Sequence, residues 1–195
     1  MVSVAVSSCP THRLAKVSTI ISDMDGTWIG TEHKPTEGGV AAIKEAEDEG
    51  LLFCFATGRC PLSALEMSCM PSLAKRPGIY SNGAVVLGEG GALLYSLDIA
   101  PAVVERVVKL VLDHQDSREE DRSAVLLNDC DTFYIAGSDK SGPPSTYALH
   151  LHEVYGDPKP IAAYPETTIP RVQLIHIVGK EEDIDHLHPL VAKEV

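Results

Sequence analysis

The sequence predicts an α/β fold with a parallel sheet, and three observations support this prediction. Residues 17–22 form a short β-branched run, and residues 51–56 form a continuous apolar run. Between them, Val40, Ile43 and Ala46 recur at the spacing of one helix face. Strand, helix and strand in this order make a βαβ unit, whose crossover is right-handed in nearly all known proteins. The two strands therefore run in the same direction, and their carboxyl ends lie at one edge of the sheet.

The ends of the first helix are also marked. Thr36 supplies a side-chain oxygen at the N-terminus, and Gly50 stands where a left-handed residue ends a helix. The apolar run that follows is typical of a strand buried on both faces. After it we expect a short helix from Pro61 to Met70, and a third strand over residues 78–81 before an Asn-Gly turn.

The second half of the chain predicts a mixture of helices and strands. Residues 84–87 and 92–96 are typical of a hairpin, and Pro101 opens a helix with apolar residues at i, i+3, i+4 and i+7. His150 and His152 alternate along a segment that we expect to be extended and solvent-exposed. We expect strands over residues 124–127, 133–136 and 172–178, a Pro/Gly/Ser-rich loop over 138–145, and a final helix through Ile184, Leu187 and Val191.

The composition is that of a soluble globular protein. Apolar residues make up 44% of the chain and charged residues 23%, which excludes a disordered or fibrous class. The net charge of −12 argues against nucleic-acid binding, because such proteins need a basic surface. No apolar stretch approaches the ~20 residues that span a bilayer, so we expect no membrane segment. Five cysteines without a Cys-x-x-Cys spacing indicate a reducing compartment, and we expect a cytoplasmic protein.

A pair of carboxylates follows the first predicted strand. Asp23 and Asp25 stand two residues apart, so on an extended chain both side chains point to the same side. Two carboxylates held close together repel unless a cation or a proton lies between them. Mg²⁺ suits this arrangement, since it takes one or two carboxylates together with phosphate and water. For this segment alone, an Asp-x-Asp-Gly turn that only ends a strand is an equal alternative.

The same pair has the chemistry of a phosphatase. With a metal ion offsetting their charge, one carboxylate can attack phosphorus while the other protonates the leaving oxygen and then activates water. Gly26 lets the backbone turn so that amide groups face the phosphoryl oxygens. Thr57, Gly58 and Arg59 add a hydroxyl, a flexible amide and a cation at the end of the second strand. By itself that second segment also fits a helix N-cap with an incidental arginine.

Three segments together resemble the Cof-type phosphatases of the haloacid dehalogenase (HAD) superfamily. They are residues 22–27 (Ser-Asp-Met-Asp-Gly-Thr), 55–59 (Phe-Ala-Thr-Gly-Arg) and 80–84 (Tyr-Ser-Asn-Gly-Ala), in this order. The resemblance implies that Asp23 is the nucleophile, which forms an aspartyl-phosphate, and that Asp25 is the acid/base. We expect Mg²⁺ as the cofactor, with Asp23 and Asp25 as its ligands. The substrate implied is a small phosphorylated metabolite such as a sugar phosphate.

The remaining site residues are assigned to two positions around the phosphate. The resemblance implies that Thr57 binds the phosphoryl group, and we expect the backbone around Gly26, Thr27 and Gly58 to help hold it. We expect Arg59 and Asn82 at the rim of the site. No residue that selects the substrate can be named from the sequence.

The resemblance also implies a domain division. A Rossmann-like HAD core carries an inserted α+β cap, so we expect the N-terminal part of the core over residues 17–98 and the cap over residues 99–195. Residues 1–16 contain no acidic residue and no clear targeting pattern, and we expect a flexible leader there.

The chain departs from the family after the cap. Family members continue with a lysine and a Gly-Asp-x-x-Asn-Asp segment that complete the site. Lys140 and Asp157 lie in short partial matches to these segments, and we interpret both as loop residues. We therefore expect that the chain stops within or just after the cap and that its parallel sheet is incomplete. The exposed edge of such a sheet favours pairing with another chain, as in a homo-oligomer.

Two further functions are consistent with the sequence. A catalytically incomplete fragment would fold and serve as a binding or regulatory element, and the absent lysine and acidic segment favour this alternative. A sugar phosphomutase would use the same aspartyl-phosphate but transfer the phosphoryl group back to a sugar. Release of phosphate without a bisphosphate activator would exclude the mutase.

Overall fold

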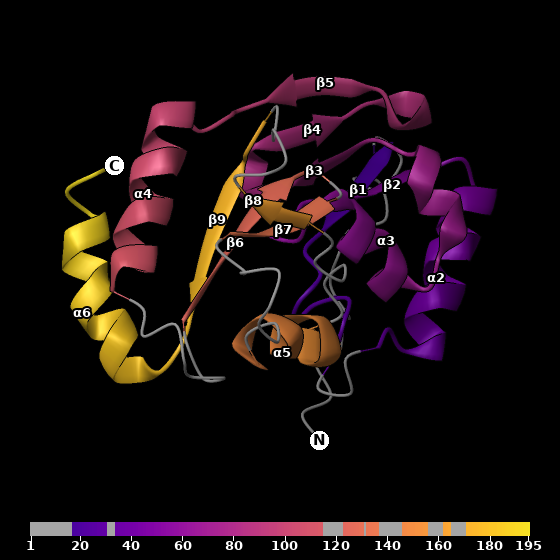
Figure 1. Ribbon diagram of the computed structural model, residues 1–195. Coiled ribbons are helices and arrows are strands. Elements are labelled where there is room, and N and C mark those ends of the chain that lie inside the picture. Colours follow the sequence, from indigo (N-terminus) through magenta and orange to yellow (C-terminus); the bar gives the residue numbers. More distant parts are fainter. Residues whose placement is uncertain are drawn as a thin grey trace.

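The predicted βαβ unit forms the N-terminal part of the protein. In this computed structural model, β1 (Thr19–Ser22) and β2 (Leu52–Phe55) pair in parallel, with Ser22 opposite Phe55. Helix α2 (Glu37–Asp48) connects the two strands (Figure 1). The parallel pairing predicted from the sequence is therefore confirmed. The structure describes residues 17–30, 34–114, 123–130, 132–136, 146–155, 162–164 and 171–195.

Both predicted ends of α2 are confirmed. The Thr36 Oγ1 accepts a hydrogen bond from the Gly39 N–H at 3.0 Å, which satisfies one of the free amides of the first turn. Gly50, with a φ of 82°, adopts the left-handed conformation just after the helix. These local signals explain why the sequence predicts α2 to within one or two residues.

A second, antiparallel sheet follows β2. Strand β3 (Gly78–Tyr80) is linked to the end of β2 by a parallel bridge between Ala56 and Ile79, and β4 (Val85–Leu87) and β5 (Leu93–Ser96) complete the order β3-β4-β5. Short 3-10 turns separate the strands at Ser81–Gly83 (η2) and Glu89–Gly91 (η3). The predicted third strand and the predicted hairpin are both present.

Helix α3 is slightly shorter than predicted. It spans Pro61–Ser68 and ends at Cys69, whose left-handed φ is 57°. A 3-10 helix, η1 (Pro71–Lys75), then leads towards β3. The sequence prediction ran to Met70, because nothing in the pattern marks a cysteine as a left-handed residue.

The second half of the chain builds a four-stranded sheet in the order β8-β7-β6-β9. Helices α4 and α6 pack against each other beside this sheet, as Figure 1 shows. The β7–β8 pair is parallel, whereas β6 runs antiparallel to both β7 and β9. The bounds are Pro101–Asp113 for α4, Ala124–Asp129 for β6, Thr132–Ala136 for β7, Ala162–Tyr164 for β8, Leu174–Val178 for β9 and Glu181–Val191 for α6.

One segment differs from the sequence prediction. Residues Thr146–Tyr155 form helix α5, where the alternation of His150 and His152 had predicted an extended chain. Ala, Leu and Glu residues in this run have high helix propensity, and over ten residues that preference outweighs a short two-residue alternation. Strand β8 was not predicted. The expected leader (1–16) and the expected loop over 138–145 lie outside the described residues.

Apolar side chains gather in three buried clusters. The first lies under β1 and β2 and includes Phe53 and Phe55, whose rings meet edge to face with centroids 5.1 Å apart. The second lies between the sheet of β6 and the helices α4 and α6. The third joins the two halves, because Cys60 beside α3 packs against Leu126 and Phe133 of the four-stranded sheet. The molecule is therefore an α/β protein in which the four-stranded sheet contacts the N-terminal half next to the end of β2.

The edge of β1 is open in the part of the chain that the structure describes. There β1 pairs with β2 alone, and its Ile21 side chain is 60% exposed. The neighbouring Val17 is also exposed. Among the described residues, no helix combines the length and the apolar character that crossing a bilayer requires.

Candidate active site

The loop after β1 turns the two aspartates outward. The Met24 carbonyl accepts hydrogen bonds from the N–H groups of Thr27, Trp28 and Ile29, at 3.2, 2.9 and 2.7 Å. Met24 itself is fully buried in the first apolar cluster, while the residues on either side of it, Asp23 and Asp25, are exposed. The spacing of two residues thus gives the two carboxylates a common, solvent-facing side.

Gly26 is required by the shape of this loop. Its φ of 78° lies in the left-handed region, which residues with a Cβ rarely adopt. The Gly26 N–H donates to the Ile29 carbonyl at 2.9 Å and so closes the turn. The amides of Gly26 and Thr27 are occupied within the loop. The N–H of the exposed Asp25 has no acceptor among the described residues, so it remains available to a ligand.

The end of β2 lies beside the start of this loop. The Ala56 N–H donates to the Ser22 carbonyl at 2.9 Å, so the residues that follow each strand, Asp23 and Thr57, leave the sheet at the same edge. Thr57 is buried, and its N–H donates to the Ile79 carbonyl of β3 at 2.9 Å. The Thr57 backbone is thereby tied to the strand on its other side.

The Thr57 side chain is oriented by its own loop. Its Oγ1 accepts a hydrogen bond from the Arg59 N–H at 3.2 Å. Since a hydroxyl can donate one hydrogen bond while it accepts another, the Thr57 O–H remains able to donate to a ligand oxygen. This is the property that a phosphate-binding threonine needs.

Gly58 and Asn82 lie in close contact. A Cβ added at Gly58 would stand 2.9 Å from the Asn82 Oδ1, so a larger residue would displace the Asn82 amide. The Asn82 N–H donates to the Thr57 carbonyl at 3.2 Å, and Asn82 holds a left-handed φ of 55°. Asn82 is exposed, and its place at the rim of a phosphate site stays a prediction.

Arg59, which the sequence predicted at the rim of the site, has a side chain that is only 8% exposed. It forms a two-pronged ion pair with Asp25, whose side chain is 56% exposed. The Arg59 Nε donates to the Asp25 Oδ2 at 2.8 Å, and the Nη2 donates to the Oδ1 at 2.7 Å. The remaining nitrogen, Nη1, donates to the Ser63 Oγ of α3 at 3.0 Å. Ser63 was missed by sequence reasoning, although its position four residues after Arg59 is a usable signal.

The Asp23 carboxylate has a different environment. Among the described residues, no N–H or O–H group donates to it and no cation pairs with it. The backbone carbonyl of Asp23 accepts a hydrogen bond from the Ser22 Oγ at 2.7 Å, which holds the residue at the end of the strand. One aspartate is therefore free and exposed, while the other is fixed by an arginine.

The donor set fits a hard divalent cation. The Asp23 carboxylate and the Asp25 carbonyl oxygen are both without a hydrogen-bond donor among the described residues, and oxygen donors of this kind suit Mg²⁺. Within the same part of the chain no three His, Cys, Asp or Glu side chains converge. Lys140 and Asp157 lie outside the described residues.

Two cysteines near the site are structural. Burial raises the pKa of the Cys54 thiol, and its Sγ lies 3.8 Å from the Ile20 carbonyl between β1 and β2. Cys60 is buried, and its Sγ accepts a hydrogen bond from the Ser63 N–H at 3.5 Å at the start of α3. Cys54 therefore behaves as a small core residue, as the sequence predicted.

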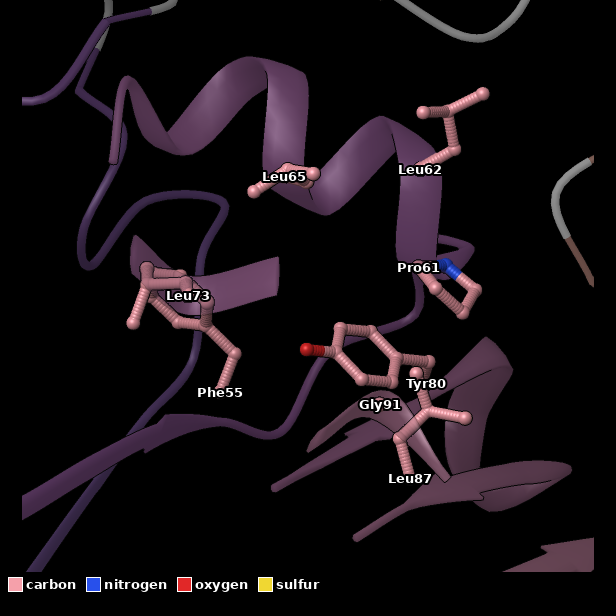
Figure 2. Close-up of a pocket in the computed structure, with 8 residues that line it drawn as sticks. All are labelled: Phe55, Pro61, Leu62, Leu65, Leu73, Tyr80, Leu87 and Gly91. Atoms are coloured by element: carbon pink, nitrogen blue, oxygen red, sulfur yellow. The ribbon is translucent and has the colours of Figure 1, made fainter. Parts of the chain in front are cut away.

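A cavity of about 260 Å³ lies behind the candidate site, between α3 and the β3-β4 strands. Most of the residues that line it have apolar side chains, and Figure 2 shows the Tyr80 hydroxyl directed towards the side of Phe55 and Leu73. Neither Asp23, Asp25 nor Thr57 lines this cavity. It is therefore a separate pocket and not the candidate site itself.

A sequence profile of the haloacid dehalogenase-like hydrolases matches residues 20–194. The chain belongs to this family. The resemblance inferred from three short segments is therefore confirmed. The match also covers the second half of the chain, where the sequence resembled the family only in the order of its predicted helices and strands.

Individual relatives agree with this assignment. The HMP-PP phosphatase of Cronobacter sakazakii is 31% identical over 87 residues, which are 44% of this chain and 31% of that protein. A HAD-like hydrolase from Bacteroides thetaiotaomicron superposes with a TM-score of 0.71 and 14% identity, over 91% of this chain and 64% of that one. A HAD subclass IIB sugar phosphatase superposes with a TM-score of 0.60 and 17% identity, over 90% of this chain and 64% of that one.

This HAD-like chain is shorter than the relatives it matches. It spans about a third of the Cronobacter phosphatase and less than two thirds of each of the two solved chains. At these low identities the solved structures establish the fold, and the fold is that of HAD hydrolases. The chain is thus a haloacid dehalogenase-like hydrolase by family.

Proposed function

We propose that this chain is a Mg²⁺-dependent phosphomonoester hydrolase in which Asp23 is the nucleophile. One observation carries the proposal: a free, exposed Asp23 carboxylate leaves the sheet beside Thr57, with a second carboxylate, Asp25, held two residues away. A carboxylate without hydrogen-bond partners has its lone pairs available for attack on phosphorus. The fixed neighbour is suited to proton transfer.

The proposed reaction has two steps. In the first, an Asp23 oxygen forms a bond to phosphorus as the bond to the leaving oxygen breaks, and Asp25 gives its proton to that oxygen. In the second, Asp25 takes a proton from water, the water oxygen bonds to phosphorus, and the aspartyl-phosphate is hydrolysed. The exposure of Asp25 allows it to exchange protons with solvent between the steps.

The phosphoryl group is proposed to lie between the two loops. The Thr57 hydroxyl donates to one phosphoryl oxygen, and the backbone around Gly26, Thr27 and Gly58 surrounds the others. The Asp25 amide supports this arrangement, since among the described residues it has no acceptor and gives the loop an N–H donor that the Gly26 turn does not use. Asn82 closes the rim above Gly58.

Magnesium is proposed as the cofactor of this site. The Asp23 carboxylate and the Asp25 carbonyl would hold it, and it would offset the negative charge of the phosphate beside two aspartates. The net charge of −12 supports a need for such a cation, because an anionic substrate is otherwise repelled.

The proposed substrate is a small phosphorylated metabolite such as a sugar phosphate. The names of two relatives support this class, since one is a sugar phosphatase and the other an HMP-PP phosphatase. We also propose a cytoplasmic location. We divide the chain into the N-terminal part of the core, residues 17–98, and a cap, residues 99–195.

A second candidate is a chain that binds but does not catalyse. The observation that favours it is the edge of β1, which is open in the part of the chain that the structure describes and carries the 60% exposed Ile21. Such an edge can accept a strand from a second copy, so we propose a homo-oligomer formed through β1.

The decisive assay uses p-nitrophenyl phosphate with and without Mg²⁺. We expect the wild-type chain to release phosphate only with the metal and Asp23→Asn to be inactive. Asp48→Asn, which changes an exposed aspartate at the end of α2, is the matched control and should retain full activity. Activity that survives Asp23→Asn or ignores the metal would refute the hydrolase mechanism, and an inactive wild-type chain would favour the binding role.

A further inference from the structure

The proposed mechanism does not use Arg59, yet Arg59 is the most constrained polar side chain of the site. All three guanidinium nitrogens donate to protein oxygens, two to Asp25 and one to Ser63. Its backbone is held as well, because the Arg59 N–H donates to the Thr57 Oγ1 and its carbonyl accepts from the Ser81 N–H at 2.9 Å. Such a fully engaged arginine cannot move to a ligand without breaking several contacts.

The contact with Asp25 has the geometry of a fork. Nε and Nη2 meet one carboxylate oxygen each, at 2.8 and 2.7 Å, which fixes both the position and the rotation of the carboxylate plane. A lysine would supply the charge but not this planar, two-point orientation. The buried partner thus orients the exposed one, as the exposed fractions of 8% for Arg59 and 56% for Asp25 indicate.

The fork leaves one side of the Asp25 carboxylate open. A carboxylate has about four lone-pair positions, and the two N–H groups of the fork occupy only one on each oxygen. The Asp25 side chain is 56% exposed. The outer lone pairs can therefore face a ligand oxygen while the inner ones remain bound to Arg59.

We propose that Arg59 is the positioning residue for proton transfer by Asp25, which rests on the function proposed above. Arg59 aims the outer lone pairs of Asp25 at the leaving oxygen. As the P–O bond to the leaving group breaks and the bond to Asp23 forms, the Asp25 O–H bond breaks and its proton moves to that oxygen. In the second step the same lone pair receives a proton from the attacking water. Arg59 neither gains nor loses a proton in either step.

The segment that carries Arg59 also contacts the four-stranded sheet. The next residue, Cys60, packs against Leu126 of β6 and Phe133 of β7, and Ser63 lies in the first turn of α3. One short segment therefore holds the fork to Asp25 and also packs against the four-stranded sheet.

The test compares two substrates that differ in their need for a proton. The p-nitrophenolate leaving group departs well without protonation, whereas the phenolate of phenyl phosphate depends more strongly on it. For Arg59→Ala we expect kcat on phenyl phosphate to fall about 100-fold, the lower end of the usual contribution of a general acid, with a much smaller loss on p-nitrophenyl phosphate and little change in KM. The kcat of Arg59→Lys on phenyl phosphate should lie between those of the wild type and Arg59→Ala. Added guanidinium should restore part of the activity of Arg59→Ala.

A matched control and an activity-independent measurement complete the test. Arg76→Ala removes another arginine–carboxylate pair, with Glu47 at 2.9 Å, and should leave both substrates unaffected. In urea unfolding, the midpoint shift of the double variant Asp25→Ala/Arg59→Ala should be smaller than the sum of the single shifts, because the two residues share one contact.

Three outcomes distinguish the possibilities. An active wild-type chain with a selective loss on phenyl phosphate and non-additive midpoints supports the role of Arg59. An active wild-type chain with equal losses on both substrates, or additive midpoints, overturns that role and leaves the proposed function intact. A wild-type chain inactive on both substrates overturns the proposed function, and the proton-transfer role of Arg59 with it.

Discussion

Strands β1 and β6 occupy opposite extremes of burial in this protein. Strand β6 has a neighbour on each side, and residues Ala124 to Asn128 are all at most 3% exposed. Strand β1 carries the proposed nucleophile but pairs only with β2 among the described residues, and its side chains alternate between exposed and half-buried. The well-packed sheet therefore supplies the stability, whereas the proposed chemistry depends on the less covered one.

This difference has a physical consequence for the site. A strand with one neighbour is held by fewer hydrogen bonds, so the positions of Asp23 and Asp25 depend on local contacts such as the Met24 turn and the Arg59 fork. Substitutions that affect stability most should therefore lie far from the residues that affect catalysis most.

The largest expected effect comes from the buried strand. Leu127→Ala removes a fully buried side chain of β6 and should lower the free energy of unfolding by about 2–5 kcal/mol. Ile21→Ala, which removes side-chain carbons from the 60% exposed position on β1, should cost less than about 1 kcal/mol. Urea denaturation followed by circular dichroism measures both. Equal losses would mean that β1 is covered in solution, as in a homo-oligomer formed through its edge.

An intermediate effect is expected at the junction of the two halves. Gln173 is buried, its Oε1 accepts from the Cys130 N–H at 2.7 Å, and its Nε2 donates to Asp98 at 2.7 Å and to Ser96 at 3.2 Å. Gln173→Ala should cost about 1–3 kcal/mol, because the half-buried Cys130 N–H loses this acceptor and Asp98 loses a donor. Ser96→Ala removes the hydroxyl that accepts from Gln173 and donates to Asp98, and it should cost less because Gln173 keeps its contacts with Cys130 and Asp98. If the urea midpoint of Gln173→Ala equals that of the wild type, the contacts of Gln173 at the junction do not contribute to stability.

The smallest effect is expected from Asp98, and it depends on pH. Burial raises the pKa of Asp98, but hydrogen bonds from Ser96 and Gln173 and the charge of Arg171 outweigh it, so that the pKa lies below its ordinary value of 3.8. A carboxyl whose pKa is lower in the folded state stabilises the fold above its unfolded pKa, and this contribution is lost as the pH falls through the folded pKa. Solvent screening keeps the contribution small.

The corresponding measurement is a pair of stability profiles. The difference in stability between wild type and Asp98→Asn should be constant above pH 3.8 and should shrink as the pH is lowered further. A difference that stays constant down to the lowest pH at which the chain folds would show that Asp98 has no depressed pKa.

Local signals explain which features the sequence could predict. The spacing of Asp23 and Asp25, the cap at Thr36 and the left-handed Gly50 all depend on residues close together in the chain, and each was predicted. The shared edge of β1 and β2 followed from the handedness of a βαβ crossover.

Other features depend on contacts that no local pattern contains. Arg59 pairs with a carboxylate 34 residues earlier, and the sequence offers many carboxylates as partners. Helix α5 was misinterpreted because alternating His150 and His152 imitate the period of a strand, while β8 has only three residues and is too short for a pattern.

Covalent trapping tests the central claim most directly. The chain is mixed with a small phosphate monoester and Mg²⁺, quenched in acid, digested and analysed by mass spectrometry. The account predicts a hydroxylamine-sensitive phosphoryl group on Asp23 in wild type and none in Asp23→Asn. A phosphoryl group on another residue, or phosphate release by Asp23→Asn at the wild-type rate, would contradict it.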